Sequence, residues 1–171
     1  IKSTNINRLY SENFIKKFIK IYFKHLNKYL INCSNENKKI FVCEIPDPVI
    51  LKEKKLIKDG IHLICPNIIT NPNIQYQVRN DVIEDGEYKN LINELKCINS
   101  LSDIFDEAVI HKNNWFLYGS CKENRKPYKL TQIYLIKDDM TLEKIENKYT
   151  NLELIKLFSI RNKTINVLID E

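Results

Sequence analysis

The sequence is poor in the residues that interrupt regular structure, with only 3 glycines and 5 prolines among 171 residues. This scarcity excludes collagen-like, linker-like and low-complexity chains. No apolar run approaches the roughly 18 residues that a membrane-spanning helix needs, so we do not expect an integral membrane protein. No two cysteines are spaced as Cys-x-x-Cys, which leaves zinc and redox motifs unsupported. The chain begins without an initiator methionine or an apolar signal segment, and the missing methionine predicts a fragment of a longer protein.

The composition is that of a globular domain, because 43% of the residues are apolar and 29% are charged. The length predicts one domain whose core needs neither disulfides nor structural metal. The five cysteines are odd in number and widely spaced, and three lie in apolar stretches, which predicts reduced thiols in an intracellular compartment. The net charge of +5 and the pI of about 8.8 mildly favour a polyanionic partner.

Helical periodicity is clearest near the N-terminus. Apolar residues recur at helical spacing over residues 11–31, and Ser11 is a suitable N-cap, so the pattern predicts a long helix there. Another face of this helix carries a lysine every four residues, at Lys16, Lys20, Lys24 and Lys28. Such a stripe is most often a solvated face, and the alternative is a track for a phosphate backbone.

The rest of the chain alternates between strand and helix patterns. We predict strands over residues 39–45 and 61–65, each ended by proline, and a helix that begins at Asn71 and Pro72 and ends at Asp85 and Gly86. A further helix is predicted over residues 88–98, two strands over 115–118 and 128–136 around a Gly-Ser loop, and a short helix over 151–160. This order indicates a mixed α/β or α+β domain with strands paired largely as hairpins.

Three places carry residues suited to phosphate or metal chemistry. His62 follows an Asp-Gly turn and could bind a phosphate, act as an acid or base, or be a structural histidine. Asp106 follows two large apolar residues, so it needs a partner or a metal if it is buried; helix capping and surface exposure are the alternatives. Residues 119–129 combine a glycine, Ser120 and four basic side chains, which could bind phosphates or form a solvated hairpin.

Five segments agree in character and in order with one known family: residues 58–66 (KDGIHLICP), 75–79 (QYQVR), 105–110 (FDEAVI), 113–122 (NNWFLYGSCK) and 126–130 (KPYKL). Together they resemble the primase domain at the N-terminal end of the large primase-helicase proteins of poxviruses and giant DNA viruses. That domain belongs to the archaeo-eukaryotic primase superfamily. The resemblance is good over residues 40–136 and looser at the flanks.

The resemblance implies an α+β (mixed α/β) fold, an archaeo-eukaryotic primase-like catalytic domain with a mainly antiparallel sheet flanked by helices, over residues 1–171. It implies a DNA-directed primase or primase-polymerase that joins nucleoside triphosphates on a single-stranded DNA template, with a covalently linked helicase module in the parent protein. His62, in a small-x-His motif, would be catalytic and contact the phosphates of the incoming nucleotide. Asp106, after an apolar residue, would be catalytic and bind Mg²⁺ or Mn²⁺.

The basic loop completes the predicted site. Besides His62, the predicted nucleotide-binding residues are Ser120, Lys122 and Lys129, which should converge on one phosphate-sized site. Arg125 and Lys126, with Arg79 from the helix after the His62 strand, are the predicted DNA-binding residues. Trp115, Tyr118 and Tyr128 are nearby aromatic residues that could stack on bases or belong to the core.

One part of the family pattern is missing. The family has two carboxylates separated by one residue on a strand before the long helix, and nothing between residues 1 and 40 supplies them. Glu44 and Asp47 have a different spacing and a different place in the order. Either the chain is a fragment, inactive alone, of a longer protein, or metal-dependent chemistry has been lost.

Three hypotheses therefore stand beside one another. The first is a viral-type primase domain, acting where viral DNA is replicated in the host cytoplasm or nucleus. The second is a non-catalytic nucleic-acid-binding module that kept the primase fold. The third is an unrelated nuclease-like domain in which Asp106 and His62 serve hydrolysis.

Overall fold

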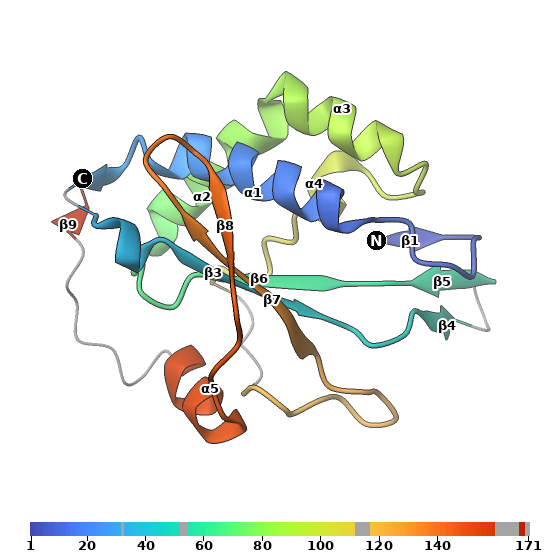
Figure 1. The fold of residues 1–171 in the computed structure, drawn as a ribbon. Helices are drawn as coiled ribbons and strands as arrows, with labels where there is room; N and C mark the ends of the chain where they lie inside the picture. Colours follow the sequence, from blue (N-terminus) through green and yellow to red (C-terminus); the bar gives the residue numbers. More distant parts are fainter. Residues whose placement is uncertain (32, 52–54, 112–116, 160–167, 170–171) are drawn as a thin grey trace. The chain divides into compact units, whose positions relative to one another are not determined.

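A computed structural model describes residues 1–31, 33–51, 55–111, 117–159 and 168–169 (Figure 1). The chain forms two compact units, each built from three separate segments. The first unit comprises Ile1–Tyr29, Asp47–Gly60 and Thr70–Asn114, and the second comprises Leu30–Pro46, Ile61–Ile69 and Trp115–Glu171. Within the described ranges, no helix is long and apolar enough to cross a membrane.

Helix α1 (Glu12–Leu26) is the longest element of the first unit. It begins where the sequence predicts, because the Ser11 side chain accepts a hydrogen bond from the Phe14 amide. It ends five residues earlier than predicted. Asn27 is its C-cap, and the predicted last turn instead contains the short strand β2 (Leu30–Ile31), which pairs with β9 (Leu168–Ile169) in the second unit.

The described part of the first unit contains three more helices: α2 (Pro72–Glu84), α3 (Gly86–Glu94) and α4 (Leu101–Ile104). The predicted apolar face of α2 is confirmed, since Ile74, Val78 and Val82 are all buried. The following helix starts two residues before the predicted range and ends four residues earlier. A short sheet in the order β1 (Lys2–Ser3), β5 (Leu56–Lys58), β4 (Val49–Leu51) lies in the same unit.

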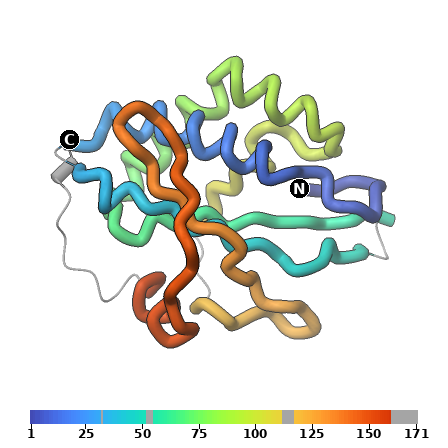
Figure 2. Tube along the Cα trace, in the orientation of Figure 1, coloured from blue at the N-terminus to red at the C-terminus, as the bar shows by residue number. Residues whose placement is uncertain are grey.

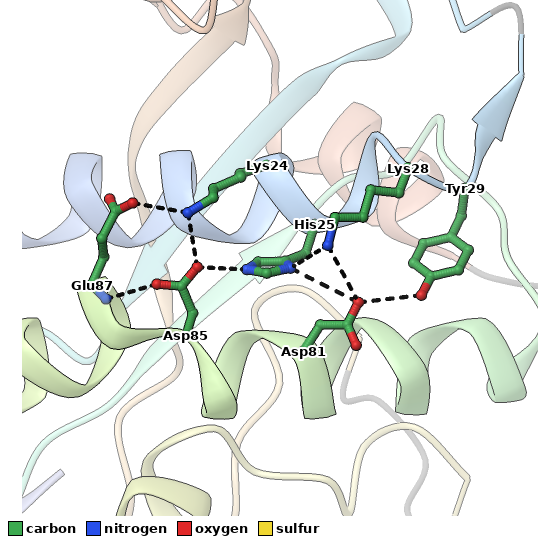
Figure 3. Close-up of polar contacts among 7 residues, drawn as sticks. All are labelled: Lys24, His25, Lys28, Tyr29, Asp81, Asp85 and Glu87. Carbon is green, nitrogen blue, oxygen red and sulfur yellow. Dashed lines mark hydrogen bonds and ion pairs between the residues drawn. The ribbon is translucent and has the colours of Figure 1, made fainter.

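Asp85 lies between α2 and α3 and caps both helices. It is the C-cap of α2, and its side chain caps α3 by accepting a hydrogen bond from the Glu87 amide at 2.7 Å. The same carboxylate lies 2.8 Å from His25 Nε2 and 2.9 Å from Lys24 Nζ on α1 (Figure 3). Burial would by itself raise the pKa of Asp85, but the hydrogen bonds from Lys24 and His25 outweigh it and lower that pKa well below its usual range.

A second carboxylate, Asp81, extends this contact one turn along α2. It accepts a hydrogen bond from the Tyr29 hydroxyl at 3.2 Å and lies 3.8 Å from Lys28 Nζ (Figure 3). Since Lys16 also pairs with Glu12, three of the four lysines in the predicted stripe are matched by acids of the chain itself. The lysines of the stripe remain largely exposed, as expected for a solvated face, and the acids beside them make the alternative of an open cationic track less favourable.

The second unit is built on an antiparallel sheet in the order β6 (Ile61–Ile64), β3 (Lys39–Glu44), β7 (Lys129–Ile136), β8 (Leu142–Ile145). A 3₁₀ helix, η1 (Asn35–Asn37), precedes β3. Figure 2 shows β7 and β8 running side by side as one long hairpin. Helix α5 (Asn151–Phe158) covers one face of the sheet, because its Leu154 packs in a buried cluster with Phe41 and Ile133.

The predicted fold class is confirmed, because antiparallel sheets are flanked by helices in a mixed α+β arrangement. The prediction of a strand over residues 115–118 is wrong for Leu117 and Tyr118, which lie outside any strand, while Trp115 and Phe116 lie outside the described residues. The strand predicted over residues 128–136 is present as β7, but its partners are β3 and β8. The prediction of a single domain over residues 1–171 stays a prediction.

Candidate functional site

His62 lies on the edge strand β6 of the second unit, directly opposite Cys43 of β3. Its half-buried imidazole stacks on the ring of Tyr128, with ring centroids 3.8 Å apart and planes 14° apart. Tyr128 immediately precedes β7, so this contact reaches across the intervening strand β3. Burial raises the pKa of the neighbouring Cys43 thiol to about 12, so this cysteine is not a candidate nucleophile.

The strand register decides which predicted residues share a face with His62. His62, Cys43 and Leu130 are paired across three strands and project to one face. The next set of partners, Ile61, Glu44 and Lys129, projects to the other face. The predicted convergence of Lys129 with His62 is therefore not favoured by the register, and it stays a prediction.

Glu44 is a buried carboxylate at the end of β3, with 7% of its surface exposed. It accepts a short hydrogen bond from the hydroxyl of Thr131, where an irregularity shifts the register of β3 and β7. The spacing of Glu44 from Asp47 does not match the acidic pair of the family. The available signal was a lone acid at the end of an apolar strand, which needs a hydrogen-bonding partner when it is buried.

The loop between Leu117 and Tyr128 is tied to the sheet by Tyr118, whose hydroxyl accepts a hydrogen bond from the Leu130 amide at 3.1 Å. Ser120 is exposed, and its hydroxyl donates to the Leu117 carbonyl at 2.7 Å. A hydroxyl has one proton, so Ser120 can donate to a phosphate only if it gives up this local bond. The Leu117 carbonyl therefore competes with a phosphate for the hydroxyl proton of Ser120.

Exposed cations occupy the tip of the same loop. Lys122, Arg125 and Lys126 are all exposed, and the Arg125 amide donates to the Lys122 carbonyl at 3.0 Å, which closes a tight turn. Asn124 in this turn has a φ of 58°, in the left-handed region that asparagine tolerates better than most residues. These three side chains belong to the same unit as His62 and present the positive charge that the sequence predicts for this loop.

Asp106 lies in the first unit, on an exposed turn after α4. Its Oδ1 accepts a hydrogen bond from the Ala108 amide at 2.9 Å, and Asp106 is exposed, which is one of the two alternatives that the sequence leaves open. Among the residues that the structure describes, no group of three or more histidine, cysteine, aspartate or glutamate side chains is arranged to hold a metal ion. Because His62 belongs to the second unit, a shared site of His62 and Asp106 stays a prediction.

Arg79 is buried inside the first unit, with 7% of its surface exposed. Its guanidinium donates to the carbonyls of Phe105 at 2.8 Å and Ser102 at 2.9 Å, and lies 3.5 Å from Glu107. These contacts hold both ends of the turn that carries Asp106. They do not favour the predicted contact of Arg79 with DNA and indicate a structural role instead.

The Asp106 turn is held from a second side by aromatic packing. Phe105 makes edge-to-face contacts with Phe18 and Tyr22 of α1, at centroid distances of 5.7 Å and 6.0 Å. The Tyr88 hydroxyl donates to the Leu101 carbonyl at 2.7 Å. Asp106 is thus exposed on a backbone that the first unit fixes firmly.

Comparison with known proteins relates the chain to a family model and to a viral protein. Residues 1–134 match the family model described as the C962R protein N-terminal AEP domain, where AEP denotes archaeo-eukaryotic primase. A protein of Acanthamoeba polyphaga mimivirus named "Putative helicase L207/L206" is 33% identical over 129 residues. That match covers 75% of this chain but 13% of the mimivirus protein.

Proposed function

The chain belongs to the archaeo-eukaryotic primase family represented by the N-terminal domain of the C962R protein, and we propose that it is a primase domain that joins nucleotides on single-stranded DNA. Since the chain spans about an eighth of the mimivirus relative, which is named a helicase, the proposal includes a covalently linked helicase module in the parent protein. Its place of action would be the site of viral DNA replication in the host cell. The observation that supports the proposal best is the presence of His62 and a loop of exposed cations in one unit.

In the proposed reaction, His62 and Lys122 bind the triphosphate of the incoming nucleotide. An imidazole N–H donates to a phosphate oxygen, and the lysine ammonium balances phosphate charge, as expected for polyphosphate recognition. His62 suits this role because its imidazole, on one face of the sheet, is only half-buried. Ser120 and Lys129 would contribute after local rearrangement.

The divalent ion expected for this family does not fit the described residues of the chain by themselves. Asp106 offers one exposed carboxylate with one oxygen engaged by a backbone amide, and Mg²⁺ needs several oxygen ligands in octahedral geometry. The requirement for Mg²⁺ or Mn²⁺ belongs to the longer protein, in which further carboxylates would accompany Asp106, and this chain alone would be inactive.

Nucleotide binding is tested by titrating the chain with a fluorescent nucleoside triphosphate. His62→Ala should weaken binding markedly, whereas His111→Ala, which changes an exposed histidine of the other unit, should leave it unchanged. Primer synthesis by the longer protein should be lost with His62→Ala under the same conditions. If the two alanine variants changed the nucleotide affinity equally, His62 would not be part of the nucleotide-binding site.

DNA binding is tested by fluorescence anisotropy of a labelled oligonucleotide across a salt series. Three phosphate contacts, from Lys122, Arg125 and Lys126, predict a slope of log affinity against log salt of about −2, at about −0.7 per contact for a single strand. Changing all three to glutamate should abolish binding. The matched control changes three exposed lysines of the same unit, Lys144, Lys148 and Lys156, and should keep most of it.

A non-catalytic nucleic-acid-binding module remains the second candidate, and the lack of a clustered acidic site among the described residues favours it. The two proposals differ in one outcome. If the longer protein with Asp106→Asn binds DNA normally but makes no primers, the domain is catalytic. If it makes no primers even unmodified, and still binds DNA through the loop, the domain is a binding module.

A further inference from the structure

We propose that Tyr128 is the positioning residue for His62: its ring fixes the plane of the imidazole so that a ring nitrogen faces the phosphate. This inference rests on the proposed function. From the sequence alone, Tyr128 is a candidate only for base stacking or core packing. The observation that carries it is the near-parallel stack of the two rings, 3.8 Å between centroids and 14° between planes.

The position of Tyr128 is set independently of His62. Pro127 restricts the backbone on one side, and the ladder of β7 begins at Lys129 on the other. One residue into that ladder, the Leu130 amide is bonded to the hydroxyl of Tyr118, and Tyr118 packs on Phe158 of α5 with centroids 5.6 Å apart. The backbone that carries the Tyr128 ring is therefore held in place on both sides of the residue.

The stack on Tyr128 matters for the orientation of the His62 ring. A histidine has a broad choice of angle about its second side-chain torsion, so an unsupported imidazole samples many orientations. A ring stacked on one face removes most of that freedom before a ligand arrives, which lowers the entropy lost on binding. Stacking needs the aromatic ring and not the hydroxyl, so phenylalanine should replace Tyr128 and an aliphatic residue should not.

The experiment combines nucleotide titration with proton–carbon NMR of the His62 ring in the same 171-residue chain. In the wild type, the ring current of Tyr128 should shift the His62 ring protons upfield. Tyr128→Phe should keep that shift and the wild-type nucleotide affinity. Tyr128→Leu should abolish the shift and weaken binding by about three- to tenfold, as expected for the loss of one aromatic pair. If the leucine variant does not fold, Tyr128→Met, with a flexible side chain of similar size, takes its place.

A double variant separates positioning from direct contact with the nucleotide. In the His62→Ala background, Tyr128→Leu should cause no further loss, because the residue it positions is gone. An equal loss of affinity in both backgrounds would mean that Tyr128 contacts the nucleotide itself. Unchanged affinity in Tyr128→Leu would mean that the stack has no role in binding. Either result overturns the inference while the proposed function stands. If the wild type does not bind triphosphates at all, the proposed function fails, and the inference fails with it.

Discussion

Replacing Arg79 by lysine distinguishes a structural arginine from a DNA contact. The guanidinium of Arg79 forms a fork that donates to two carbonyl groups at once, those of Phe105 and Ser102. An ammonium group keeps the positive charge but presents it at a single point, so it cannot reproduce both bonds in the same geometry. The lysine variant therefore changes the hydrogen bonding of this buried site without changing its charge.

The magnitude follows from the bonds at stake. A hydrogen bond to a charged group contributes about 1.5–3 kcal/mol, and a buried carbonyl left without a donor adds to the loss. The pairing of Arg79 with Glu107 adds little, because Glu107 is 44% exposed. We expect Arg79→Lys to lower the free energy of unfolding by about 2–3 kcal/mol. With an m-value of about 2 kcal/mol per molar urea, the midpoint of unfolding falls by about 1–1.5 M.

The assay is urea unfolding followed by circular dichroism, with oligonucleotide binding measured on the same samples in conditions where the variant is folded. Arg125→Lys is the matched control, since Arg125 is exposed, and it should not move the midpoint. The salt slope of DNA binding should be the same for Arg79→Lys and the wild type. If the lysine variant unfolds at the wild-type urea concentration, the argument from the guanidinium fork is wrong and a DNA contact at Arg79 regains support.

Three further outcomes are expected. Burial favours a raised pKa for Asp85, but hydrogen bonds from Lys24 and His25 hold that pKa below the value of 3.8 expected when unfolded. The resulting stabilisation is complete above about pH 4 and is lost as the pH falls further. The urea midpoint of unfolding should therefore drop between pH 6 and pH 3 less steeply in Asp85→Asn than in the wild type. Since burial raises the pKa of Cys43 to about 12, iodoacetamide at pH 8 should modify exposed Cys121 in the folded chain and leave Cys43 unmodified, as mass spectrometry of the digested protein would show. Calorimetry should detect only weak binding of Mg²⁺ to this chain, and micromolar binding that disappears in Asp106→Ala would contradict that expectation.

The starts of α1 and α2 were predictable because their signals are local. Ser11 and Asn71 each accept a hydrogen bond from an amide three residues later, as their sequence positions suggested. Strand β3 was predictable from its run of apolar residues. Strand β8, with the sequence Leu-Glu-Lys-Ile, was missed because its two central residues are exposed and charged. The strands β4 and β5 were missed because three residues are too few for a periodic pattern.

The candidate site was predictable only residue by residue. His62 and the loop cations could be named from the sequence, but the stack of His62 on Tyr128 depends on the pairing of β3 with both β6 and β7, which no local pattern reports. The role of Arg79 was hidden for a related reason. Its partners are backbone carbonyls of residues more than 20 positions away, and the only local hint was its place beside buried Val78 on α2.

The interleaving of the two units bears on how the chain folds and how it can be cut. The chain passes between the units five times. Cleavage at any single loop therefore divides at least one of the two units between the two fragments. The segment Asp47–Gly60 illustrates the consequence for folding, because Glu44 and Ile61, which flank it, are paired partners in β3 and β6. Once that pairing forms, the segment is a closed loop whose ends no longer have to find each other, and the entropy it loses on joining the first unit is smaller. Early pairing of β3 with β6 would therefore speed the completion of the first unit.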